Sequence, residues 1–194
     1  MMAARSSHRL FVALALPPDV RQAVHRWCAA ARLGRRGWRL VRDENLHLTL
    51  RFLGDGSTKV AEELGPDLER VTRGLRAPRL VLESWGSFGP RGKPRVIWVG
   101  VGGQVESLRA LGERVEQCVR RWGFPPETRP LKPHLTVARP RRGERLHLPA
   151  ASCPTPEPAR FTGKEVALYE SALGPGGPVY TARHRFDLEA ADDS

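Results

Sequence analysis

The sequence has few cysteines, no cluster of Cys and His at metal-ligand spacing, and no long apolar runs. Its three cysteines are odd in number and show no CxxC spacing, which argues against a disulfide framework and against a zinc ribbon. No apolar run approaches the ~18 residues that read as a membrane-spanning helix. A Walker-type glycine loop, HExxH and GxSxG are also missing. P-loop NTPases, zincin proteases and GxSxG hydrolases therefore fit this chain poorly.

Positive charge is what the sequence has in excess. The net charge is +11, the isoelectric point is near 10.8, and 28 of the 32 basic residues are arginine. A guanidinium contacts phosphate oxygens through two parallel hydrogen bonds, so this composition favours a polyanionic partner such as RNA. The alternative is a solvated basic surface that merely reflects a composition rich in Arg, Ala, Gly and Pro.

Hydrophobic periodicity predicts an α+β chain. Amphipathic helices are expected after Pro17-Pro18, after an N-cap at Ser57 with a kink or split at Gly65-Pro66, and from Val105 to Trp122. Strands are expected at Leu10–Leu16, Trp38–Val41, Leu46–Leu53, Arg79–Trp85, Arg95–Val101, Leu131–Ala138, Phe161–Leu173 and Val179–Leu188. We expect one domain over residues 9–188, with flexible ends at 1–8 and 189–194. The basic segment 139–160 is expected to be a long surface loop whose role the sequence does not assign.

An internal repeat organises these elements. A strand, a helix and then His47 are echoed by a second strand, a helix and then His134. His47 follows Val12 by 35 residues, and His134 follows Trp98 by 36. This self-similarity predicts two related lobes, each contributing one histidine-bearing strand to a central cleft.

The cellular location is expected to be the cytoplasm. Cys28 and Cys118 fall on or near apolar faces of predicted helices, where reduced core thiols fit best. Arg5 and Arg9 followed by Leu10–Leu16 resemble a short signal peptide. That apolar run lies at the lower length limit for such a segment, and the repeat needs it as a core strand. We therefore expect a protein without membrane contact.

Two copies of His-Leu-Thr carry the chemistry. In His47-Leu48-Thr49, and again 87 residues later, the imidazole and the hydroxyl lie on one face of a strand because side chains alternate with a period of two. An imidazole pKa near ~6.5 lets one histidine donate a proton while the other accepts one. Such a pair can cleave a phosphodiester without a metal ion.

Neighbouring residues can assist this pair. The hydroxyls of Thr49 and Thr136 can donate to phosphate oxygens, and Arg139 can neutralise charge that develops on phosphorus. The other four histidines, His8, His25, His147 and His184, are isolated. His184 lies between two arginines, where it either touches RNA or occupies a solvated strand position.

The paired motifs resemble those of a known superfamily. His47-Leu-Thr-Leu-Arg-Phe-Leu-Gly54 and Lys132-Pro-His-Leu-Thr-Val-Ala-Arg139 are similar to motifs of the 2H phosphoesterases, in particular the RNA 2′,3′-cyclic phosphodiesterases of bacteria and archaea, also called 2′-5′ RNA ligases. The resemblance extends from about Leu10 to Leu188. It includes Arg95-Val-Ile-Trp-Val-Gly and the closing Glu170-Ser-Ala-Leu and Gly177-Pro-Val-Tyr180 segments.

The resemblance implies a fold and a set of roles. The fold would be bilobal, with two pseudo-symmetric lobes that each hold an antiparallel sheet and flanking helices around a basic central cleft. His47 would give a proton to the leaving 3′ oxygen, and His134 would accept one from water, so the product would be a 2′-phosphate. The implied phosphate and base contacts are Thr49, Thr136, Arg139 and Phe52, where Phe52 either stacks on a base or is buried. We expect no metal, no cofactor, a monomer, and RNA with a 2′,3′-cyclic phosphate end as the partner.

Two rival functions stay open at this point. A 2H phosphoesterase could act on another small cyclic phosphate or on a 2′-5′ oligonucleotide with the same residues at the phosphate. A noncatalytic RNA-binding protein could use the arginine-rich surface, although it has no need of two matched His-x-Thr faces. The sequence also leaves open whether hydrolysis or reversible ligation matters.

Overall fold

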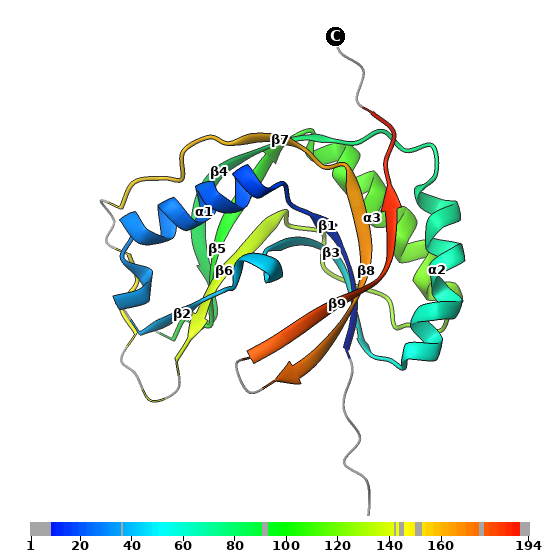
Figure 1. Cartoon of the computed structure of the whole chain (residues 1–194), viewed down its shortest axis with the longest axis horizontal. Helices are drawn as coiled ribbons and strands as arrows, with labels where there is room; N and C mark the ends of the chain where they lie inside the picture. Colours follow the sequence, from blue (N-terminus) through cyan, green and yellow to red (C-terminus); the bar gives the residue numbers. More distant parts are fainter. Residues whose placement is uncertain are drawn as a thin grey trace, which may run out of the picture.

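The computed structural model describes residues 9–35, 37–90, 93–141, 143, 146–149, 153–174 and 177–190 (Figure 1). Its strands are β1 (Arg9–Ala15), β2 (Trp38–Leu40), β3 (His47–Asp55), β4 (Arg79–Phe88), β5 (Val96–Gly103), β6 (His134–Pro140), β7 (Arg160–Thr162), β8 (Glu165–Gly174) and β9 (Gly177–Asp187). Its helices are α1 (Pro18–Ala30), α2 (Thr58–Thr72) and α3 (Val105–Arg121), with 3-10 turns η1 (Leu33–Arg35) and η2 (Asp43–Asn45).

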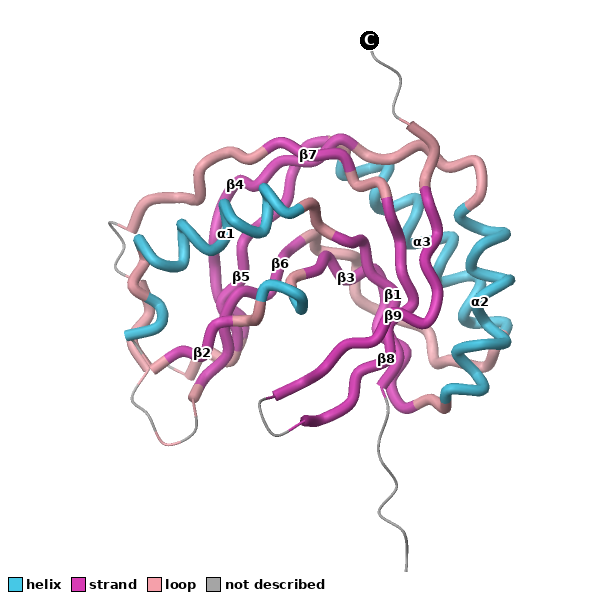
Figure 2. Tube along the Cα trace, in the orientation of Figure 1, coloured by secondary structure: helices cyan, strands magenta, loops and turns pink. Residues whose placement is uncertain are grey.

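The strands form one curled antiparallel sheet that is nearly divided in two. Its order is β7-β4-β5-β6-β3-β1-β8-β9, and β2 pairs with β6 outside this path. Between β3 and β6 the register holds a single residue pair, Leu48 with Leu135. We call β1, β3, β8 and β9 the terminal lobe, and β2 with β4 to β7 the central lobe. The predicted α+β fold with two lobes is confirmed, although the two expected sheets are joined through this one pair (Figure 2).

Helices α1 and α3 each pack on the lobe opposite to the strand that precedes them. Helix α1 follows β1 of the terminal lobe, yet its Trp27 ring lies 6.0 Å from the Trp85 ring of β4 in the central lobe. Helix α3 follows β5 of the central lobe, yet it packs against β3 and against α2, which in turn packs on β8 and β9. Buried α3 side chains such as Leu108 and Val115 each contribute about 1.5–3 kcal/mol through removal from water.

Helix α2 begins where the sequence predicted but is not split. The Ser57 hydroxyl accepts a hydrogen bond from the Val60 N–H at 3.2 Å, as an N-cap does. The helix then runs without a break through Pro66. A side chain at Gly65 would lie 2.4 Å from the His184 ring, so this glycine makes room for His184 against the helix. His184 is therefore half-buried against α2, which differs from the solvated strand position that the sequence suggested.

One expected strand is two strands in the structure. We predicted a single strand over residues 161–173, but β7 ends at Thr162 and β8 begins at Glu165. Strand β7 pairs with β4 of the central lobe, whereas β8 pairs with β1 of the terminal lobe. A side chain at Gly163 would lie 2.5 Å from Leu14, so the glycine lets the chain cross closely over the core between the lobes.

The described parts of the basic segment 139–160 are fixed to the central lobe. Its start belongs to β6, which runs to Pro140. The Trp38 indole N–H donates to the His147 carbonyl at 2.9 Å, and the Trp27 indole N–H donates to the Pro154 carbonyl at 2.8 Å. The expected surface loop is thus held by two buried tryptophans. Residues 142, 144–145 and 150–152 lie outside the described part of the chain.

The remaining expectations concern the ends and the cysteines. Residues 1–8 and 191–194 lie outside the described residues. Glu189, which we placed in a flexible end, is instead hydrogen-bonded through its N–H to Leu75 and through its carbonyl to Ala77. Cys28 and Cys118 are buried free thiols, as predicted, and burial raises the pKa of Cys28 to about 12. Within the described residues, no helix has the length and apolarity to cross a membrane.

Candidate active site

The single pair that joins the two lobes also brings the two motifs together. Because Leu48 faces Leu135 in an antiparallel pair, His47 and Thr136 flank this pair on one side, and Thr49 and His134 flank it on the other. Directly opposed residues share a face of the sheet, and diagonal neighbours are roughly 7–8 Å apart. The histidines occupy one diagonal of this arrangement and the threonines the other. We call the face that carries them the inner face of the sheet.

Both imidazole rings are held in the same way. Nδ1 of His47 lies 2.7 Å from the carbonyl oxygen of Asn45, and Nδ1 of His134 lies 2.6 Å from that of Lys132. A carbonyl only accepts, so each Nδ1 carries a proton and donates it. In each ring Nε2 is then the nitrogen left to accept or to donate a proton. Each carbonyl comes from the residue two positions before its histidine, so the two halves of the site repeat one local geometry.

A β-bulge at the same place in each motif changes which side chains reach the inner face. In β3 the partners of Val12 and Ala13 are Arg51 and Thr49, so Leu50 is skipped. In β6 the partners of Ile97 and Trp98 are Ala138 and Thr136, so Val137 is skipped. An extra residue shifts the alternation by one position. Strict alternation would have turned Arg51 and Ala138 toward the histidines.

The bulges place Phe52 and Arg139 at equivalent positions on the inner face. Phe52 pairs with Phe11, and its side chain is 58% exposed. Arg139 is exposed as well. The interpretation of Phe52 as a buried residue is therefore wrong. The structure gathers all six residues predicted for the site on this face: His47, Thr49, Phe52, His134, Thr136 and Arg139.

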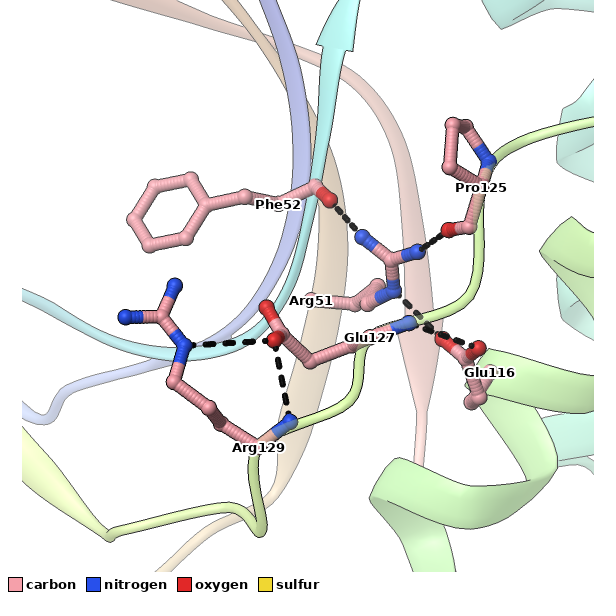
Figure 3. A network of polar contacts seen from close by, with 6 residues as sticks. All are labelled: Arg51, Phe52, Glu116, Pro125, Glu127 and Arg129. Atoms are coloured by element: carbon pink, nitrogen blue, oxygen red, sulfur yellow. Dashed lines mark hydrogen bonds and ion pairs between the residues drawn. The ribbon is translucent and has the colours of Figure 1, made fainter.

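Arg51 turns to the opposite side of β3 and anchors it, a role that sequence reasoning missed. Its guanidinium pairs with the Glu116 carboxylate of α3 and donates to the carbonyl oxygens of Phe52 and Pro125 (Figure 3). Glu116 also accepts from the backbone N–H of Glu127 at 3.1 Å. Figure 3 shows the Phe52 ring pointing away from this network. An arginine between two apolar residues of a core strand was the signal that could have found it.

The electrostatics of the inner face oppose protonation of both histidines. Burial lowers the pKa of His47 to about 4, with further lowering by Arg139 and His134, against an increase from the hydrogen bond to Asn45. Burial also lowers the pKa of His134, as do the charges of Lys132 and Arg139, while the Lys132 carbonyl raises it. Both rings are therefore neutral at neutral pH in the free protein. An anion between them would raise both pKa values.

Aromatic rings line each histidine, and the sequence analysis did not identify them. The Phe11 and Tyr180 rings lie 4.8 and 5.4 Å from the His47 ring. On the other side, the Phe88 and Trp98 rings lie 5.0 and 6.4 Å from His134. Lys132 places its ammonium 4.5 Å above the Trp98 ring. The repeat could have revealed two of these residues, because Phe11 and Trp98 each precede their histidine by 36 residues.

Other parts of the described chain do not compete with this site. The described residues hold no group of three or more His, Cys, Asp or Glu side chains that could bind a metal ion. A pocket of about 490 Å³ contains none of the six predicted residues and is lined by Ala15, Leu16, Pro17, Asp19, Phe161, Thr162, Lys164 and Glu165.

Curated relatives are similar over most of the chain. An RNA 2′,3′-cyclic phosphodiesterase of Thermus thermophilus is 38% identical over 197 residues, covering 93% of this chain and 90% of the relative. One of Aeropyrum pernix is 37% identical over 156 residues, covering 78% and 85%.

Solved structures and a family model agree with these relatives. E. coli LigT in complex with NADP+ superposes with a TM-score of 0.71 at 28% identity, covering 94% of this chain and 98% of LigT. A solved protein of Thermus thermophilus gives 0.69 at 32% identity, covering 95% and 100%. The model described as LigT like Phosphoesterase matches twice, at residues 14–98 and 99–180, once for each histidine motif. The chain therefore belongs to the LigT-like phosphoesterase family.

Proposed function

We propose that this protein hydrolyses the 2′,3′-cyclic phosphate end of RNA to a 2′-phosphate by acid–base catalysis between His47 and His134. The observation that carries the proposal is the register of β3 and β6, which sets the two His-x-Thr faces against each other on one face of the sheet. The relatives named RNA 2′,3′-cyclic phosphodiesterase support the substrate class. The proposed partner is an RNA end, including tRNA-like fragments, and the proposed acting form is a cytoplasmic monomer.

The reaction removes one proton from the attacking water and delivers one proton to the leaving 3′ oxygen. Nε2 of His134 accepts a proton from water, whose oxygen attacks phosphorus, and the bond from phosphorus to the 3′ oxygen breaks. Nε2 of His47 protonates that 3′ oxygen. A general acid or base at this position contributes about 10²- to 10⁴-fold. Turnover leaves the proton on His134, and exchange with solvent returns both rings to their starting states.

The threonines and Arg139 serve the phosphate itself. The Thr49 and Thr136 hydroxyls lie on the diagonal that crosses the line between the histidines, so both can donate to the non-bridging oxygens. Arg139 lowers the pKa of both imidazoles, so its charge acts on the space between them. There it stabilises the negative charge that grows on the phosphate oxygens in the transition state.

Phe52 is the proposed contact for the terminal base. It is exposed beside Phe11, on the histidine side of β3. Stacking of a base on an aromatic ring is tolerant of base identity, which suits an enzyme that reads RNA ends. Phe52 and Arg139 occupy equivalent positions in the two halves of the site but differ in chemistry. This difference sets the orientation of the bound RNA end, with its terminal base toward β3.

Turnover of a 2′,3′-cyclic nucleotide in excess EDTA tests this function directly. We expect hydrolysis to continue, with no stoichiometric metal in the purified protein, and phosphorus NMR to show a 2′-phosphate. Absence of turnover together with tight RNA binding would favour a noncatalytic RNA-binding protein. A 3′-phosphate product would show that the donor and acceptor roles of His47 and His134 are reversed. These roles follow from the resemblance, because the pKa values of the free protein do not distinguish donor from acceptor.

A further inference from the structure

Two arginines face each other across adjacent strands at the edge of the site. In the pairing of β2 with β6, Arg39 is the direct partner of Arg139, so both side chains leave the same face of the sheet. Both are exposed. Within the described residues, neither guanidinium has a hydrogen bond or ion pair to a carboxylate. Like charges directly opposite each other destabilise a sheet. This pair therefore does not contribute to the stability of the fold, and it is a candidate for binding an anion.

The pair lies on the inner face, next to the reacting centre. Burial lowers the pKa of both histidines and raises that of Tyr180, and the charge of Arg139 acts to lower all three, so it reaches both histidines and the ring beside His47. Strand β5 occupies one edge of β6, and β3 and β2 share the other edge. Arg39 therefore lies on the strand next to Arg139, on the edge of β6 that pairs with β3 nearer its start and with β2 nearer its end.

The β8–β9 hairpin comes close to the Arg39 guanidinium. Nη1 of Arg39 lies 3.1 Å from the position that a Cβ at Gly177 would occupy, and Gly177 has a φ of +113°, a conformation that favours glycine. One residue further on, the Pro178 carbonyl accepts a hydrogen bond from the Asn45 side chain at 2.9 Å. The hairpin of the terminal lobe thus lies against the β2–η2 segment, with Gly177 close to the exposed Arg39 guanidinium.

From this arrangement we propose that Arg39 and Arg139 together bind the phosphate next to the cyclic one, which is the first internucleotide phosphate of the RNA chain. The inference rests on the proposed function. Each guanidinium has five N–H donors, so Arg139 can contact the reacting phosphate and share the neighbouring one with Arg39. The pair makes an RNA chain end a better substrate than a mononucleotide. An anion between the two guanidiniums also removes their mutual repulsion.

The test compares two substrates in two variants. One substrate is a nucleoside 2′,3′-cyclic phosphate. The other is a dinucleotide that ends in the same nucleoside 2′,3′-cyclic phosphate and has one additional phosphate, the internucleotide one. We expect Arg39→Gln to lower kcat/KM for the dinucleotide about tenfold, mainly through KM, as the loss of one charged phosphate contact does. Its effect on the mononucleotide should stay within about twofold. Arg114→Gln, an equal charge change on the exposed surface of α3, is the matched control and should alter neither substrate.

A neutral linkage provides an independent arm. If the internucleotide phosphate is replaced by a methylphosphonate, the native protein should lose most of its preference for the dinucleotide, and Arg39→Gln should have little further effect. Equal losses for the mononucleotide and the dinucleotide would overturn the inference while leaving the proposed function intact. Failure of the native protein to turn over either substrate would instead reject the proposed function. Calorimetric binding of the same two nucleotides would then decide the role of Arg39.

Discussion

At the scale of single residues, the two histidines share one orientation and differ in what surrounds them. Each donates through Nδ1 to a carbonyl two positions earlier, at 2.7 and 2.6 Å. His47 lies among Phe11 and Tyr180, whereas His134 lies beside the Lys132 charge. In both rings Nε2 is the nitrogen left for proton transfer. The direction in which a substrate binds therefore decides which histidine donates a proton and which accepts one.

Replacing either histidine should remove most of the activity. We expect His47→Ala and His134→Ala each to lower kcat/KM by about two to four orders of magnitude, as the loss of one general acid or base does. The double variant should lose far less kcat/KM than the product of the two single effects, because both histidines act in the same catalytic step. Steady-state kinetics on a 2′,3′-cyclic nucleotide give all three values. Near-normal activity in either single variant would contradict the acid–base pair.

The lowered pKa values set the expected pH profile. A lowered pKa means that an imidazole releases its proton at a lower pH, so the form with one neutral and one charged ring exists below the usual histidine range of ~6.5. We expect the bell-shaped profile of kcat/KM, which reports the free protein, to have its maximum below pH ~6.5.

The profile of kcat should lie at higher pH than that of kcat/KM. The bound phosphate is an anion, and a nearby negative charge raises an imidazole pKa. Kinetics between about pH 4 and pH 8 measure both profiles on one substrate. A maximum of kcat/KM above neutrality would show that the environment of the two histidines is not the one described.

At the scale of elements, the bulges in β3 and β6 decide which side chains the substrate meets. Each bulge follows its threonine and delivers the third residue after that threonine, Phe52 or Arg139, to the inner face. Bulges recur next to active sites because they redirect a side chain without changing the rest of a strand. Here the same device, used twice, supplies an aromatic ring to one strand and a cation to the other.

Phe52 offers a direct test of the first bulge. Phe52→Ala should raise KM for a cyclic-phosphate RNA end by the loss of about 1–3 kcal/mol of stacking, which is about 5- to 150-fold. Because the side chain is 58% exposed, its loss should leave thermal stability nearly unchanged. Kinetics and a melting curve of the same preparation separate the two effects. A large fall in melting temperature with unchanged KM would indicate a packing role instead.

The Arg51 network is expected to stabilise the fold on the other side of that bulge. Arg51→Met would leave the Glu116 carboxylate without its partner, and the side chains of this pair are only 8% and 22% exposed. Because Glu116 keeps some contact with water, we expect a loss of about 2–3 kcal/mol in the free energy of unfolding, below the value for a fully buried pair. Urea denaturation measures it. Adding Glu116→Gln should recover part of the loss, and no recovery would contradict this account.

At the scale of the whole molecule, the sequence predicted the parts better than their placement. Periodicity located the helices and the histidine strands because these signals are local. The two bulges, the division of β7 from β8 and the exchange of α1 and α3 between lobes depend on which distant strand becomes a neighbour. The direction of Phe52 stayed open in the sequence for the same reason, since alternation counted from His47 does not reveal a skipped Leu50.

The exchanged helices predict that the two lobes unfold together. Four of the five tryptophans, Trp27, Trp38, Trp85 and Trp98, lie in or pack on the central lobe, whereas the fifth, Trp122, bonds to α2, and α2 and α3 cover the terminal lobe. Tryptophan fluorescence and far-ultraviolet circular dichroism therefore report mainly on different lobes. We expect their urea transitions to coincide, as in a two-state protein. Separate midpoints would show that each lobe is stable without the helix it borrows.

The exchange also bears on ancestry. The family model matches the chain twice, and each match carries one histidine motif together with the helix, α1 or α3, that precedes it. In a half-length chain of this kind, the helix would lack the sheet on which it packs in the full chain. Two such chains would complete each other, each covering the other's sheet, and the two histidines would come from different copies. Fusion of the two genes would then have turned a swapped dimer into one chain and freed its halves to diverge, one toward Phe52 and the other toward Arg139.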